Sequence, residues 1–118
     1  MISPDFARSL AEEWIAAWNA HDLERVLSHY EPDFEMASPR IVDIVGEPSG
    51  LLRGHASVGA YWQRALQLVP ELRFDLLDVF VGARSVALMY RNQAGRGCLE
   101  VLELGSSGRI ARAAAHYA

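Results

Sequence analysis

The sequence contains a single cysteine, Cys98, which cannot form a disulfide within the chain. A lone thiol is typical of a reducing compartment. No apolar run approaches the ~20 residues of a membrane-spanning helix, and the first residues lack the basic and apolar segments of a secretory leader. These absences predict a cytoplasmic location and no membrane partner.

Positive charge is also scarce and scattered. Eleven basic residues, all of them arginine, stand singly along the chain against fifteen acidic ones, for a net charge of −4. A duplex-binding surface needs clustered cations to displace counterions. We therefore expect no nucleic-acid partner.

Two kinds of cofactor signal are missing. The four histidines, at positions 21, 29, 55 and 116, never stand three or four residues apart as helical metal ligands do. Gly46, Gly50 and Gly54 lie close together but match no dinucleotide-binding pattern. We therefore expect no metal and no cofactor. The 51% of hydrophobic and 22% of charged residues are typical of an ordinary globular chain.

The length of 118 residues fits one domain, covering residues 1–118, that buries a core of its own. Ser3-Pro4-Asp5 is a strong helix start, and apolar residues then recur every four positions to about residue 20. Asp22 is expected to cap a second, shorter helix that carries Tyr30 and ends at Pro32. A third helix is predicted from about residue 55 to 69, where Pro70 stops it.

Strand patterns fill the rest of the chain. Residues 33–38 alternate as a short strand, with Phe34, Met36 and Ser38 on one face, and residues 40–54 are expected to form a long ordered loop with room for a short hairpin. Four strands are predicted after that, at residues 72–81, 85–92, 98–104 and 109–117. Their short connections make neighbouring strands antiparallel.

Several of these strands are apolar on both faces. Leu99 and Val101, for example, alternate with Cys98 and Leu102. A sheet that helices cover on one side needs only one apolar face, so the other face requires a second cover. We therefore predict a homodimer that packs through the sheet, with a contact formed by Leu88, Leu99, Val101 and His116.

The order of elements and several local signatures resemble one superfamily. The signatures are Trp18 to Leu23 (WNAHDL), Arg53-Gly54-His55 before Tyr61-Trp62, Phe74 to Val81 (FDLLDVFV), and the last strand from Gly108 to Tyr117. The chain resembles the nuclear transport factor 2-like superfamily, and within it the SnoaL-like and steroid delta-isomerase-like small proteins. The resemblance covers nearly the whole chain. It implies an α+β cone, in which a curved antiparallel sheet wraps around the N-terminal helix, with three helices, an apolar pocket and usually a dimer.

The resemblance also implies where chemistry would lie. Steroid isomerases of this superfamily use a carboxylate base after the first strand, a tyrosine on the first helix and a protonated acid on a late strand. These positions fall on Ser38, Trp14 and Glu100. Because an alcohol cannot take a proton from carbon near neutral pH, Ser38 excludes a standard delta-isomerase. Glu100 is the candidate catalytic residue.

A hairpin that turns symmetrically about Ala94-Gly95 would pair Arg91 with Cys98 and Met89 with Glu100. Arg91 and Glu100 would then lie diagonally on one face of the sheet. The pair is either a salt bridge on a partly solvent-exposed face of the sheet or a charged pair at the floor of an apolar pocket. The predicted pocket residues beside Glu100 are Trp14, Trp18, Met36, Ser38, Tyr61, Trp62, Met89, Arg91 and Tyr117.

Two functions follow from this sequence. The first is a small-molecule-binding domain that acts as a cofactor-free isomerase, cyclase or lyase on a hydrophobic, polyketide- or terpene-like substrate. The second is a non-catalytic ligand-binding or assembly module of the same fold. Ser38 in place of a base favours the second function, and Glu100 in an apolar strand favours the first. Burial would raise the pKa of Glu100 and a nearby Arg91 would lower it, so its charge state stays open, as does the face of Asp78.

Overall fold

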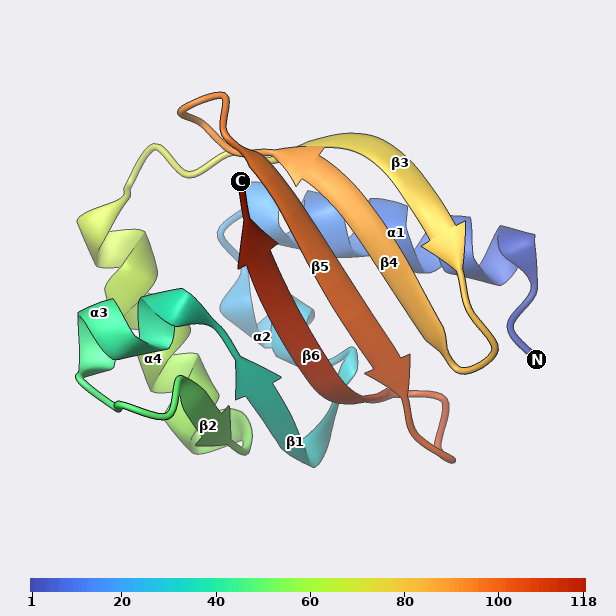
Figure 1. Ribbon diagram of the computed structural model, residues 1–118, viewed down its shortest axis with the longest axis horizontal. Helices are drawn as coiled ribbons and strands as arrows, with labels where there is room; N and C mark the ends of the chain where they lie inside the picture. Colours follow the sequence, from blue (N-terminus) through green and yellow to red (C-terminus); the bar gives the residue numbers. More distant parts are fainter.

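The computed structural model describes residues 1–118 and is built on one six-stranded sheet, in the order β2-β1-β6-β5-β4-β3. Helix α1 (Pro4–Asn19) packs against β3 and β4, α4 (His55–Leu68) packs against β1 and β2, and the short α2 (Leu23–Leu27) contacts both helices (Figure 1). The curved sheet wraps around α1, which confirms the predicted α+β cone. The strands are β1 (Tyr30–Ala37), β2 (Leu51–Arg53), β3 (Asp75–Val81), β4 (Ser85–Arg91), β5 (Gly97–Leu104) and β6 (Ile110–Tyr117).

Three details of the predicted architecture are wrong. The fold has four helices instead of three, because α3 (Pro39–Val45) occupies the first half of the expected loop. The sheet is mixed, since β1 and β6 run parallel, with Met36 opposite Ala113. The second half of the loop contains β2, which pairs antiparallel with β1 across α3, so the expected hairpin within residues 40–54 does not form. None of the helices combines the length and the apolar character needed to cross a membrane.

Helices α1 and α3 begin at the same local signal, a serine followed by a proline. The Ser3 hydroxyl accepts a hydrogen bond from the N–H of Phe6 at 3.1 Å. The Ser38 hydroxyl accepts one from the N–H of Arg40 at 3.2 Å. Such a cap stabilises a helix by about 1 kcal/mol, because the first N–H groups have no partner inside the helix. Gly46 ends α3 in a left-handed conformation with φ of 80°.

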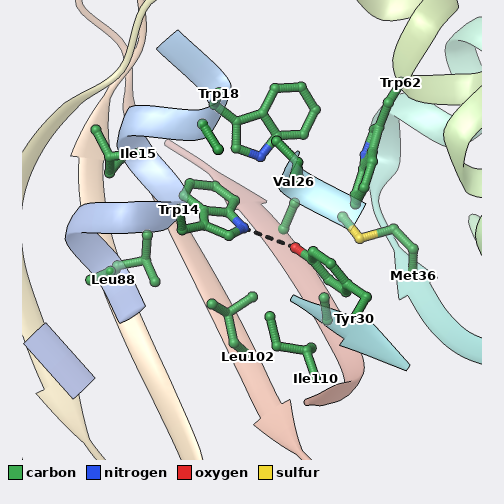
Figure 2. Packing of buried hydrophobic residues seen from close by; sticks show 14 of the residues in the cluster. Trp14, Ile15, Trp18, Val26, Tyr30, Met36, Trp62, Leu88, Leu102 and Ile110 are labelled. Atoms are coloured by element: carbon green, nitrogen blue, oxygen red, sulfur yellow. Dashed lines mark hydrogen bonds between the residues drawn. The ribbon is translucent and has the colours of Figure 1, made fainter. Parts of the chain in front are cut away.

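Buried hydrophobic side chains pack between α1, α4 and the inner face of the sheet (Figure 2). Trp14 Nε1 donates a hydrogen bond to the Tyr30 hydroxyl at 2.8 Å, which ties α1 to β1. Tyr30 was expected in the second helix, but that helix ends at Leu27 and Tyr30 begins β1. The Asn19 side chain fixes the approach to β3, because it accepts from the N–H of Phe74 at 2.7 Å and donates to its carbonyl at 2.9 Å.

The turn between β4 and β5 differs by one residue from the predicted turn. Asn92 Oδ1 accepts hydrogen bonds from the N–H groups of Ala94 and Arg96, both at 3.0 Å. The turn therefore closes over residues 92–96, and Arg91 pairs with Gly97 instead of Cys98. Since side chains alternate along a strand, a shift of one residue moves each of them to the opposite face relative to its partner strand.

This shift overturns several predicted placements. Met89 and Arg91 lie on the outer face of the sheet, so no Arg91–Glu100 pair forms. Leu88 is the residue opposite Glu100, and it is fully buried on the inner face. The prediction that Leu88 takes part in a dimer contact is therefore wrong. Asp78 pairs with Met89 and also lies on the outer face.

No helix covers the outer face of β4, β5 and β6 (Figure 1). A row of apolar side chains crosses this face from strand to strand, as the pairings of the ladder show. Phe80 at one end of the row is 48% exposed. The row consists of Phe80, Ala87, Val101 and Ala114.

Candidate functional site

A cavity of about 160 Å³ lies between α1, α3, α4 and the inner face of the sheet. Most of its wall is hydrophobic. Three of the predicted pocket residues lie outside this wall: Met89 and Arg91 point away from it, and Ser38 is buried as the cap of α3. The predicted residues that do line the cavity are Trp14, Trp18, Met36, Tyr61, Trp62, Glu100 and Tyr117.

Aromatic rings make up the inner part of the wall. Trp14 stacks on Phe74 with ring centroids 5.8 Å apart, and Trp18 meets Trp62 edge to face at 5.1 Å. The centroid of the Tyr90 ring lies 4.5 Å from that of the Phe74 ring. Figure 2 shows Trp14 and Trp18 on α1 and Trp62 on the other side of the core. Trp18 Nε1 is the one fully buried side-chain nitrogen or oxygen atom without a hydrogen-bond partner. Such rings offer a rigid apolar surface to a ligand.

Glu100 is the only acidic residue of the wall, and it is 3% exposed. In the sheet it lies between Leu88 and Ala115. Its Oε1 accepts a long hydrogen bond of 3.5 Å from the Tyr90 hydroxyl, it forms no salt bridge, and its Oε2 has no partner in the chain.

Burial, with no cation paired to the carboxyl group, decides the charge state of Glu100. Burial raises its pKa to about 8, and the hydrogen bond from Tyr90 lowers it by less. The carboxyl group is therefore mostly protonated at neutral pH. It can donate a hydrogen bond into the cavity as well as accept one.

The other titratable groups of the wall also keep their protons. Burial raises the pKa of Tyr61 to about 12, that of Tyr90 well above its usual value, and that of the Cys98 thiol. The Ser38 hydroxyl outside the wall is engaged with the N–H of Arg40 and, at 3.5 Å, with the Tyr61 hydroxyl. The cavity thus holds a proton donor and no ionised base. No three or more potential metal-ligating side chains gather anywhere in the structure.

Several wall residues were not predicted from the sequence. Arg40 and Ile44 reach the cavity from α3, in the segment expected to be a loop. The Ser38-Pro39 helix start was the signal that could have placed them there. Phe74 lines the cavity just before β3, where Asn19 holds its backbone, and no local pattern indicates that long-range contact.

Comparison with known proteins gives a family match over most of the chain. The SnoaL-like domain family matches residues 11–116. A SnoaL-like protein of unknown function from Burkholderia thailandensis is 52% identical, with a TM-score of 0.95 over 99% of this chain and 98% of that one. The search of curated proteins found no match.

More distant solved structures share the fold. A candidate isomerase of the SnoaL-like family from Agrobacterium tumefaciens is 20% identical, with a TM-score of 0.76 over 95% of this chain and 97% of that one. TerC, co-crystallised with polyporic acid, is 16% identical, with a TM-score of 0.78 over 95% of this chain and 91% of that one. This protein belongs to the SnoaL-like family and has its nuclear transport factor 2-like fold.

Proposed function

We propose that the protein binds a small hydrophobic molecule in this cavity, and that Glu100 donates a hydrogen bond to an oxygen atom of that molecule. The observation that carries the proposal is a buried, protonated acid in an apolar wall whose Oε2 has no partner. A carbonyl or hydroxyl of a ligand would supply the missing partner.

The volume of the cavity limits the size of the ligand. An engineered cavity of about 150 Å³ in another protein holds one benzene molecule, and this cavity measures about 160 Å³. One six-membered ring with short substituents fills such a space. A monocyclic terpene or a single-ring polyketide fits it, and a larger ligand would extend past the exposed wall residues Leu68 and Gln93.

The catalytic form of this proposal is a cofactor-free isomerisation or cyclisation. Glu100 would give its proton to a ligand oxygen or carbon, and the carboxylate left behind would accept a proton from a second ligand position. A pKa of about 8 suits both steps, because a catalytic group works best when its pKa is near the ambient pH. The candidate isomerase among the structural relatives supports this form.

The second candidate is a non-catalytic ligand-binding module. The lack of an ionised base in the wall favours it, because most proton abstractions from carbon need one. The two candidates share the cavity and differ only in whether the Glu100 proton moves.

Ligand binding is tested with the monocyclic terpene ketone carvone, followed by the tryptophan fluorescence of the cavity wall. Ala65→Phe places a ring in the cavity from α4 and is expected to abolish binding. Ala60→Phe, at an exposed position of the same helix, is the matched control and is expected to bind carvone as the wild type does. Equal binding by wild type and Ala65→Phe would contradict the proposal.

Catalysis is tested separately with Glu100→Gln and Glu100→Leu. The glutamine keeps a hydrogen-bond donor but has no proton to transfer, and the leucine has neither. A catalytic role predicts that wild type incorporates deuterium from D₂O next to the carvone carbonyl, and that Glu100→Gln binds carvone without this exchange. Exchange at the uncatalysed rate in the wild type assigns the protein to the non-catalytic class for this ligand.

We further propose that a second copy of the chain covers the outer face of the sheet. The apolar row across this face and the exposed Met89 beside it form a patch that a monomer would leave in water. Each copy offers the same patch, as a two-fold interface requires. The buried free thiol of Cys98 supports a reducing location such as the cytoplasm.

A further inference from the structure

Arg40 is a cation in the wall of an otherwise apolar cavity. It is half-buried in the first turn of α3, and its guanidinium carbon lies 5.0 Å from the centroid of the Tyr117 ring. The four salt bridges of the structure all use other residues. Arg40 therefore has no acidic partner, although the chain carries more acidic than basic residues.

The position of Arg40 is fixed by the local fold. The Ser38 hydroxyl accepts from its backbone N–H, and the Tyr117 ring supports its guanidinium group. A second guanidinium, that of Arg96, lies 5.7 Å from the same ring, but its Nε donates to the Ala118 carbonyl at 2.7 Å. Of the two cations beside Tyr117, Arg40 is the one with all its side-chain donors free.

Arg40 and Glu100 line the same cavity but form no salt bridge with each other. Tyr61, Tyr117 and Cys98 all have a pKa raised chiefly by burial, and the positive charge of Arg40 opposes that rise in each of them. Arg40 has no such effect on Glu100, whose pKa responds only to burial and to Tyr90. The cavity wall therefore carries both a neutral donor, Glu100, and an unpaired cation, Arg40.

We propose that the natural ligand is an amphipathic carboxylate. Its ring lies among the aromatic side chains, an oxygen of the ring or its substituent accepts from Glu100, and its carboxylate pairs with the guanidinium of Arg40. A guanidinium presents two parallel N–H groups that match the two oxygens of a carboxylate. This inference rests on the proposed function, since it names the class of molecule that the cavity binds.

The test compares two probes that share one carbon skeleton, phenylpropionate and the neutral phenylpropanol. Dissociation constants are measured by tryptophan fluorescence, because three tryptophans line the cavity. The wild type is expected to bind the carboxylate roughly tenfold more tightly than the alcohol, which is the range of a charge-assisted hydrogen bond. Raising the salt concentration should weaken carboxylate binding and leave alcohol binding unchanged.

Two arginine variants assign this preference to a residue. Arg40→Gln is expected to reduce carboxylate affinity to that of the alcohol while alcohol affinity stays constant. Arg91→Gln makes the same change on the outer face of the sheet and is expected to alter neither the carboxylate affinity nor the alcohol affinity. The salt dependence in the wild type tests the idea independently of whether Arg40→Gln folds normally.

The possible failures are distinguishable. If neither phenylpropionate nor phenylpropanol binds the wild type, the proposed function and this inference both fail for single-ring ligands. If the wild type binds both probes equally, or if Arg40→Gln weakens both by the same factor, only the inference fails. Arg40 then covers the Tyr117 ring as a purely structural side chain.

Discussion

Replacing Glu100 with glutamine is expected to stabilise the protein progressively as the pH rises. In the folded chain burial keeps the Glu100 proton up to a pKa of about 8, whereas the ordinary value, which applies to the unfolded chain, is 4.5. Between these two values the unfolded chain binds fewer protons than the folded one, so a rise in pH favours unfolding. Below pH 4.5 both states carry the proton, and the group exerts no penalty.

The size of the effect follows from the two pKa values. A shift from 4.5 to about 8 corresponds to about 5 kcal/mol of stability lost above pH 8, at about 1.4 kcal/mol per unit. At pH 7 about 3 kcal/mol of this loss is already present. Domains of this size are stable by about 5–15 kcal/mol, so the loss is a large share of the total. Glutamine does not ionise, and the variant avoids the loss.

The measurement is the free energy of unfolding in urea, for wild type and Glu100→Gln, from about pH 4 to about pH 9. The difference between the two proteins should grow in favour of the variant as the pH rises and level off above pH 8. A constant offset from the packing of the amide leaves this slope unchanged. Glu103→Gln, on the outer face of the same strand, measures the effect of removing an acid outside the core. A difference between wild type and Glu100→Gln that does not vary with pH would refute the reasoning.

Two further predictions concern the core and the outer face. Trp14→Phe should destabilise the protein by about 1–3 kcal/mol more than Trp18→Phe in urea unfolding, because only Trp14 donates a hydrogen bond, and its loss leaves the buried Tyr30 hydroxyl without a partner. Equal losses would show that this hydrogen bond contributes nothing. Sedimentation of the wild type should give twice the chain mass of 13.1 kDa. Val101→Glu places a charge on the outer face and should give the monomer, whereas Gln63→Glu, at an exposed position of α4, should stay dimeric. A monomeric wild type at micromolar concentration contradicts the dimer.

The elements that could be predicted from the sequence are those with local signals. Helix α1 begins at the Ser3 cap, and α4 and the four last strands lie between glycine and proline breaks close to the expected residues. The same cap signal occurs at Ser38, but Gly46, Pro48 and Gly50 follow within a few residues and favour a loop. The predicted loop therefore covers all of α3 after Pro39, and Arg40 with it.

Contacts between segments far apart in the chain have no local sequence signal that would predict them. Alternation of apolar residues indicates that β1 is a strand, but it does not record which strand lies beside it. The parallel pairing of β1 with β6 is fixed by the three-dimensional fold, in which the N–H of Ile110 donates to the carbonyl of His29. The same applies to Arg40 and Tyr117, which are far apart in the chain and meet only because β6 ends beside α3.

The number of residues in one turn determines the chemistry of the cavity. With the turn centred between Ala94 and Gly95, Arg91 would share the face of Glu100 and hold it as a carboxylate, paired and unable to donate a proton. Asn92 instead organises a turn over residues 92–96, and Arg91 is directed to the outer face. Glu100 remains buried without a cation, so its pKa rises and it keeps its proton. An insertion or deletion of one residue in this turn would therefore change the site from a neutral donor to an ion pair, even with every other residue of the wall unchanged.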